Sequence, residues 1–256
     1  MSILFADSNC DLNFSQIKQF GIEYINMPFS LHNDSVVDIE ASFFEEVFAP
    51  YLSQGNNLVY VHEGANYFNS YANLKKAIKK LKVDYPENTI TLIDSGNTSV
   101  GYAYIVYQSF LKHKTGCSET ALATYVKKLK GEVATLVSMN NANFNKCGYD
   151  IKTENALVKP VIYSTCDGYE VVDKVTNKKK LYSAMVNAIL KYGENVADYP
   201  IFIAYSGVEN DALELKAELE KVVGCNAKIL INKMNDKDIY MSGNKTLTIS
   251  FHKKNI

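Results

Sequence analysis

The chain has 256 residues, 47% of them hydrophobic, which is enough for one large or two modest domains with a substantial core. Its formal net charge of -1 gives no overall attraction to nucleic acid or to an anionic membrane surface. Every basic residue is a lysine, so a site for a carboxylate or a phosphate must use lysine, hydroxyl, amide or backbone N–H groups in place of arginine.

The five cysteines are scattered and include no Cys-x-x-Cys pair, so the sequence predicts neither a disulfide framework nor a zinc site. Met1 is followed by a short apolar run without the basic segment that begins a signal peptide. No apolar run approaches the length of a membrane span. We therefore expect a soluble, cytoplasmic protein without a metal or another cofactor.

In the first part of the chain, short apolar runs alternate with segments that have apolar residues at helical spacing. The predicted strands cover residues 2–6, 22–29, 58–61, 90–93 and 133–137. The predicted helices cover residues 14–20, 41–48, 67–82, 100–111 and 119–130, and Pro50 should limit the second of them. This alternation is typical of βαβ units, which predicts an N-terminal domain with a parallel α/β sheet over residues 1–155.

After about residue 155 the pattern changes, and Cys166-Asp167-Gly168 predicts a hairpin between strands at 158–163 and 169–172. Further strands are expected at 200–205, 228–231 and 246–251, with helices at 177–192 and 210–223. We predict an α+β domain with a mixed or antiparallel sheet over residues 156–256.

Two of the predicted strands end in similar polar turns, Asp7-Ser8-Asn9 and Asp94-Ser95. The carboxyl ends of parallel strands are where open α/β sheets bind ligands, so these turns suggest a shared polar rim. The alternative is that they are ordinary helix caps. No phosphate-binding loop, dinucleotide-binding motif or hydrolase motif is present. Hydroxyl and amide groups at strand ends would suit a small polar head group.

The order and the local sequences of several segments resemble those of the DegV family, the bacterial fatty-acid-binding proteins that serve as lipid-carrying subunits of fatty acid kinase. The segments are Phe5–Leu12, Thr91–Gly101, Val158–Ile162 and Ile201–Ser206. The resemblance implies a two-domain fold and a long-chain fatty acid whose acyl chain is buried between the domains. It also implies a non-catalytic role, in which the bound carboxylate is presented to an ATP-dependent kinase.

This chain departs from the family pattern at the head group. The Thr-Ser-Gln-Pro-Ser turn is absent, and Asn66 and Tyr67 stand where a second turn has Ser and Gly. The resemblance therefore assigns lipid binding to Asn66, Tyr67 and either Ser95 or Ser99, and gives Asp7 and Asp94 structural roles. Asn66, Ser95 and Ser99 have helix capping as the alternative.

Simple energetics separates the carrier function from the kinase function. Burying roughly fourteen methylenes stabilises a complex by about 11 kcal/mol before association costs. One hydrogen bond to a carboxylate adds roughly 1.5–3 kcal/mol, so the loss of one or two hydroxyls should not abolish lipid binding. Asp150 and Met241 replace a family Arg and His that face the kinase. Kinase coupling is therefore more in doubt than lipid binding.

Two other functions remain open at this point. The chain could be an interaction or regulatory protein whose pocket is filled by Tyr67, Phe68 and Tyr149. It could also be a small-molecule enzyme that uses Asp7 with the His62-Glu63 pair, although no nucleophile or metal partner is evident.

Overall fold

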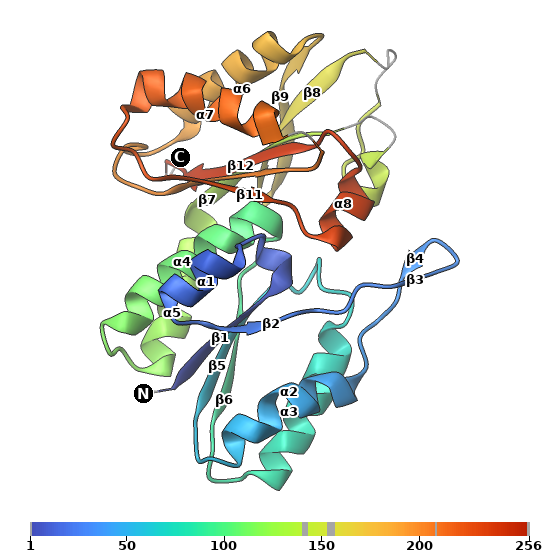
Figure 1. The fold of residues 1–256 in the computed structure, drawn as a ribbon, viewed down its shortest axis with the longest axis vertical. Helices are drawn as coiled ribbons and strands as arrows, with labels where there is room; N and C mark the ends of the chain where they lie inside the picture. Colours follow the sequence, from blue (N-terminus) through green and yellow to red (C-terminus); the bar gives the residue numbers. More distant parts are fainter. Residues whose placement is uncertain (1, 140–142, 153–156, 208, 255–256) are drawn as a thin grey trace.

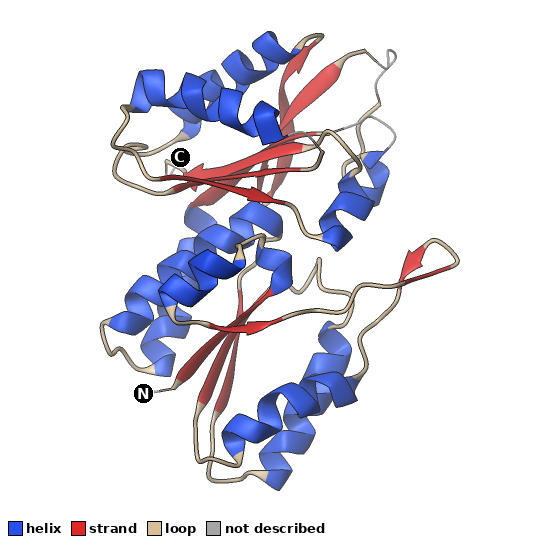
Figure 2. Cartoon of the chain, in the orientation of Figure 1, coloured by secondary structure: helices blue, strands red, loops and turns tan. Residues whose placement is uncertain are grey.

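The computed structural model describes residues 2–139, 143–152, 157–207 and 209–254. Two sheets follow one another along the long axis of the molecule, each with helices packed on it (Figure 1). Figure 2 shows that helices cover both sides of the lower sheet. The mixed α/β class and the two different sheets that the sequence predicted are confirmed.

The first sheet has four parallel strands in the order β2-β1-β5-β6. They are β1 (Ile3–Asp7), β2 (Glu23–Ile25), β5 (Leu58–His62) and β6 (Ile90–Asp94). The helices around this sheet are α1 (Phe14–Phe20), α2 (Ala41–Leu52), α3 (Tyr71–Asp84), α4 (Ser99–Lys114) and α5 (Glu119–Leu129). The chain turns from one side of β1 to the other after β2, so the topological switch lies between β1 and β5, which is where such sheets form a crevice.

Both faces of the first sheet are buried, which explains why its strands are continuous apolar runs. Phe5 and Tyr60 pack against α2 and α3, whereas Leu4 and Val61 pack against α1, α4 and α5. Helix α4 lies between the two sheets and is buried from Ser99 to Tyr107. Its outer partners include apolar side chains of the second sheet, so α4 joins the two halves.

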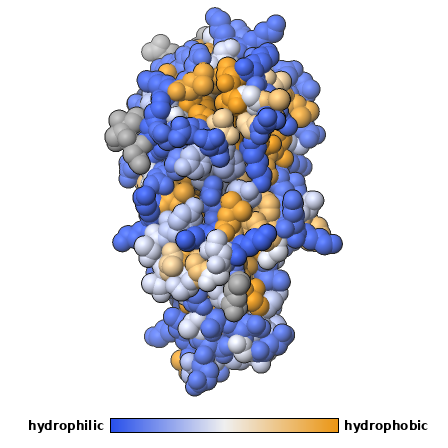
Figure 3. All heavy atoms as spheres, turned by 90° about the vertical axis from the view of Figure 1, so that its left-hand side faces the viewer, coloured by the Kyte–Doolittle hydropathy of each residue, from blue (hydrophilic) through white to orange (hydrophobic). Residues whose placement is uncertain are grey.

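The second sheet is mixed, with six strands in the order β11-β10-β12-β7-β8-β9. They are β7 (Val133–Ser138), β8 (Lys159–Thr165), β9 (Gly168–Val175), β10 (Ile201–Tyr205), β11 (Ile229–Lys233) and β12 (Leu247–His252). Helices α6 (Lys178–Tyr192) and α7 (Glu209–Val223) cover one face, and the short α8 (Asp236–Ser242) follows β11. The space-filling view shows apolar side chains gathered over this upper half (Figure 3).

The expectation that residues 133–137 belong to the first sheet is wrong. Strand β7 pairs antiparallel with β12 and β8, with Leu136 opposite Ile249. An apolar run predicts that a strand is buried, but not which strand it pairs with. Here β7 pairs with β12, the last strand of the chain. The predicted domain boundary at 155/156 lies outside the described residues, and β7 shows that it does not separate the two sheets.

Three local boundaries also differ from the prediction. Strand β2 ends at Ile25, and a small hairpin of β3 (Leu31–His32) and β4 (Ser35–Val36) follows it. Helix α3 begins at Tyr71, later than expected. Helix α2 continues past Pro50 to Leu52, because proline in the last turn removes one backbone donor while the Ser53 N–H still bonds the Ala49 carbonyl at 2.9 Å.

Candidate functional site

The turn after β1 is held by the buried carboxylate of Asp7. One oxygen accepts a hydrogen bond from the Asn9 N–H at 2.9 Å, and the other accepts from the hydroxyls of Tyr60 and Tyr102 at 2.6 and 2.9 Å. Burial raises the pKa of Asp7, and these hydrogen bonds oppose the shift. All of its bonds hold the turn and the core, so the predicted structural role of Asp7 is confirmed.

The turn after β6 is built in the same way around Asp94. Its Oδ1 accepts hydrogen bonds from the N–H groups of Gly96 and Ala65 at 3.0 and 3.1 Å. Burial acts to raise the pKa of Asp94, but these bonds lower it overall. Gly64 lies so close to this turn that a Cβ atom there would be 2.8 Å from the Asn97 nitrogen. The ends of β5 and β6 therefore pack directly on one another. The shared rim that the sequence suggested for the Asp7 and Asp94 turns would cross β5, which lies between β1 and β6.

The structure separates the two serines that the sequence proposed for the head group. Ser95 is fully buried, and its hydroxyl donates to the Asn97 carbonyl at 3.0 Å within its own turn. Ser99 has a left-handed backbone with φ of 50° and donates its hydroxyl to Asp11. Neither serine caps α4, whose N-cap is Thr98. The capping alternative is therefore wrong for both.

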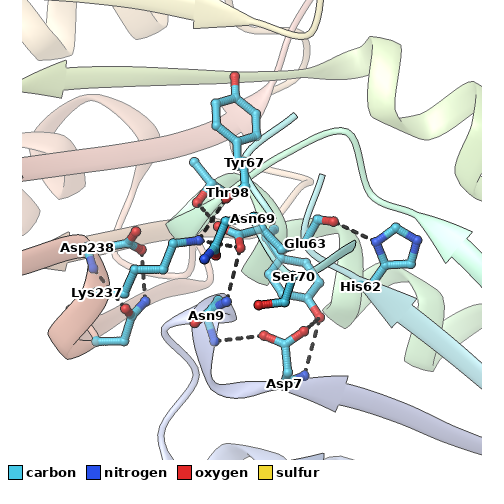
Figure 4. A network of polar contacts seen from close by, with 12 residues as sticks. Asp7, Asn9, His62, Glu63, Tyr67, Asn69, Ser70, Thr98, Lys237 and Asp238 are labelled. Carbon is cyan, nitrogen blue, oxygen red and sulfur yellow. Dashed lines mark hydrogen bonds and ion pairs between the residues drawn. The ribbon is translucent and has the colours of Figure 1, made fainter. Parts of the chain in front are cut away.

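Glu63 is the centre of a buried polar network at the end of β5 (Figure 4). It is fully buried, and its carboxylate accepts hydrogen bonds from Asn9 at 3.0 Å, from Thr98 at 2.6 Å and from the Lys237 ammonium at 2.6 Å. Lys237 also donates to the Tyr67 carbonyl at 2.9 Å. Since Lys237 belongs to α8, this ion pair ties the first sheet to the second half of the molecule.

The network contains more carboxyl groups than the single ammonium of Lys237 can neutralise. Burial raises the pKa of Glu63 to about 8, and the Lys237 ammonium opposes this shift. Burial also raises the pKa of Asp238 to about 7 and that of Asp11 to about 6. Lys237 was not predicted from the sequence, because one lysine in a short helix has no distinguishing pattern.

His62 does not form a catalytic group with its neighbours. Its Nδ1 lies 2.6 Å from the Glu63 backbone carbonyl, so this nitrogen carries the proton and donates it. Its ring packs near Tyr71 and Phe68, and burial lowers its pKa. The Glu63 and Asp7 carboxylates are bonded to other partners, and within the described residues no hydrogen bond joins the side chains of Asp7, His62 and Glu63.

A cavity of about 340 Å³ lies between the rim of the first sheet and one face of the second. Asn66, Tyr67 and Ser99 line it, whereas Ser95 does not. Apolar contacts come from Val137, Met139, Met234 and Met241, and hydroxyls come from Thr135, Ser164, Thr246 and Thr248. Its volume falls in the range of small-molecule sites, which are mostly apolar with a few polar groups.

The aromatic side chains that could fill this pocket, in the alternative of an interaction protein, leave it open. Tyr67 and Tyr149 form parts of its wall, whereas Phe68 packs in the core of the first sheet against Phe44. Asn66 does not cap α3, whose N-cap is Ser70, so its capping alternative is wrong. No hydrogen bond of the Asn66 side chain is found within the described part of the chain, which leaves its amide available.

A second cavity, of about 530 Å³, also has Lys237 in its wall. Three of its asparagine side chains are already engaged: Asn9 with Glu63, Asn13 with Asn232, and Asn235 with Asp11. The smaller cavity, with the available amide of Asn66 and a wall of methionines, is therefore the better candidate for ligand binding.

A family model described as "Uncharacterised protein, DegV family" matches residues 39–254. The chain belongs to the DegV family. A DegV domain-containing protein of Clostridium perfringens is 23% identical, and the match covers 85% of each chain. The predicted family membership is confirmed, and the match extends from just before α2 through the candidate cavity to the last strand.

Solved structures have the same fold as this DegV family chain. A stearic acid-binding protein from Eubacterium ventriosum has a TM-score of 0.85 and 17% identity, with 99% of each chain covered. A DegV family protein from Eubacterium eligens, loaded with heptadecanoic acid, has a TM-score of 0.82 and 15% identity, with 99% of this chain and 100% of that chain covered. At these identities the likeness establishes the fold alone.

Two further features of the structure bear on function. Across the described residues, no group of three or more His, Cys, Asp or Glu side chains is placed to hold a metal ion. Within the same residues, none of the helices combines the length and the apolar character that crossing a membrane requires.

Proposed function

We propose that this chain is a cytoplasmic carrier that binds one long-chain fatty acid, with the acyl chain in the 340 Å³ cavity between the two sheets. The observation that carries the proposal is this cavity, whose wall includes Met139, Met234 and Met241. Methionine side chains adapt to flexible apolar ligands. Solved relatives of the same fold were crystallised with stearic and heptadecanoic acids, which supports the same ligand class.

The polar end of the ligand would meet the rim of the first sheet. The available Asn66 amide and the Tyr67 side chain line the cavity there. The Ser99 hydroxyl also lines it, but its bond to Asp11 makes it a poorer donor to a ligand. Ser95 lies outside the lining, so we propose for it a structural role in the turn.

Native mass spectrometry of the gently purified protein tests this function. We expect a mass increment of one acyl chain, which disappears on delipidation and returns when a fatty acid is offered. A protein that carries no acyl chain and gains none would refute the carrier function. It would favour the interaction protein with a repurposed pocket.

The finer part of the proposal is that the chain presents the carboxylate to an ATP-dependent fatty acid kinase. Its support is the family resemblance, and Asp150 weighs against it, because this residue is exposed where the family has a basic side chain. The test is acyl phosphate formation from the loaded protein, ATP and a bacterial fatty acid kinase. If no acyl phosphate forms, the kinase partner is refuted and the carrier function still stands.

A further inference from the structure

A cation gives a ligand carboxylate its strongest hydrogen bonds, and this chain has no arginine to supply one. Two lysines line the candidate cavity, Lys146 and Lys237. Lys237 is only 14% exposed and is already bonded to the Glu63 carboxylate and to the Tyr67 carbonyl. Its positive charge is therefore used by the protein itself.

Lys146 is in a different position. It lies in the short 3-10 helix η4 (Asn145–Cys147) and is exposed, and its ammonium lies 4.5 Å from the centre of the Tyr240 ring. Across the described residues, no carboxylate forms an ion pair with it. An exposed contact of this kind with an aromatic ring contributes about 0.5–1 kcal/mol, whereas a hydrogen bond to a charged group contributes about 1.5–3 kcal/mol. A ligand carboxylate would therefore compete successfully for this ammonium.

The charges of the cavity wall also favour Lys146 over Lys237 as the partner of a ligand carboxylate. Glu63 and Asp238 line the cavity near Lys237. A ligand carboxylate beside them would place three acidic groups around one lysine ammonium. The residues that follow Lys146 in the chain, Cys147, Gly148 and Tyr149, also line the cavity and carry no charge as a thiol, a glycine and a phenol. The short helix η4 packs on α8, and across the described residues Lys146 is the cavity lysine that no carboxylate already pairs with.

We propose that Lys146 is the specificity-determining residue of this cavity, which pairs with the ligand's carboxylate and selects free carboxylic acids over uncharged lipids of equal chain length. This inference rests on the proposed function of fatty acid binding. It assigns the cationic role to a residue that lies four positions before Asp150, where the sequence resemblance placed the family's basic side chain.

The test compares a charged and an uncharged ligand of the same length, palmitic acid and hexadecanol. The delipidated full chain is titrated with each by displacement of a fluorescent acyl probe. The variants are Lys146→Gln, Lys146→Arg and the control Lys174→Gln. Lys174 is an exposed lysine of β9 outside the cavity lining.

We expect Lys146→Gln to weaken palmitic acid binding about tenfold, which corresponds to about 1.4 kcal/mol, and to leave hexadecanol binding unchanged. Lys146→Arg should keep the wild-type preference, and Lys174→Gln should behave as wild type. Unchanged palmitic acid binding in Lys146→Gln, or an equal loss for both ligands, would overturn the assignment while lipid binding stands. A wild-type protein that binds neither ligand would instead overturn the carrier function and this assignment together.

Discussion

Replacement of Lys237 by methionine should reveal how much the buried ion pair stabilises the junction of the two halves. The substitution keeps a straight apolar side chain but removes the ammonium 2.6 Å from Glu63 and 2.9 Å from the Tyr67 carbonyl. Glu63 would then be fully buried with only Asn9 and Thr98 as donors. Removal of one partner of a buried ion pair costs about 3–5 kcal/mol, and we expect a loss in this range at pH 9.

The free energy of unfolding that Lys237→Met removes should be smaller at pH 6 than at pH 9. Burial raises the pKa of Glu63 from 4.5 to about 8, and the Lys237 ammonium opposes that shift, so its removal raises the pKa further. A carboxyl group whose pKa rises on folding binds more protons in the folded state, so the free energy of unfolding falls as pH rises from the unfolded pKa to the folded pKa. The variant therefore loses more stability than wild type between pH 6 and pH 9.

Lys221→Met provides a matched control for this experiment. The Lys221–Glu218 pair has the same 2.6 Å distance, but its side chains are 64% and 43% exposed. A surface pair of this kind contributes about 0.2–1 kcal/mol. Urea unfolding followed by circular dichroism at pH 6 and pH 9 gives the free energies of unfolding. If Lys237→Met costs no more than Lys221→Met at pH 9, the ion pair does not stabilise the junction as we infer.

Three other substitutions test separate parts of the site. Ser99→Ala should cost about 1–3 kcal/mol in urea unfolding, because buried Asp11 loses a donor; an unchanged midpoint would contradict this. Tyr60→Phe should destabilise by a similar amount, because Asp7 loses its 2.6 Å hydrogen bond, and a cost below about 0.5 kcal/mol would show that Tyr102 suffices. Met241→Trp, in the cavity wall, should abolish the acyl adduct in native mass spectrometry without unfolding the protein; retention of the adduct would place the ligand elsewhere.

The roles of the turn aspartates followed from the sequence because they depend on neighbours in the chain. Asp7 and Asp94 accept hydrogen bonds from N–H groups two residues later, Asn9 and Gly96, and such local bonds are typical of Asp after a strand. The candidate cavity, which the Asp94 turn borders, could not be predicted in the same way. Its wall also comes from β7, β8, β12 and α8, which are distant in the sequence.

The outcome for the two serines shows where local patterns lose their predictive value. Both follow a strand and precede a helix, so both looked equally suited to capping or to ligand binding. The direction of each hydroxyl depends on what lies nearby in space. Ser95 faces its own turn, and Ser99 meets Asp11 from a different turn. Sequence spacing alone contains no information about that second partner.

By itself, the sequence determined the α/β class, the polar strand ends and the absence of arginine, because apolar periodicity, turn residues and composition are local properties; the resemblance of several segments indicated the family. Tertiary structure alone decided that β7 joins the second sheet, that Lys237 neutralises Glu63 across the junction and that a cavity remains open beside Tyr67. These features depend on which distant surfaces meet, since burial raises the pKa of Glu63 and commits Lys237 only after both halves have packed.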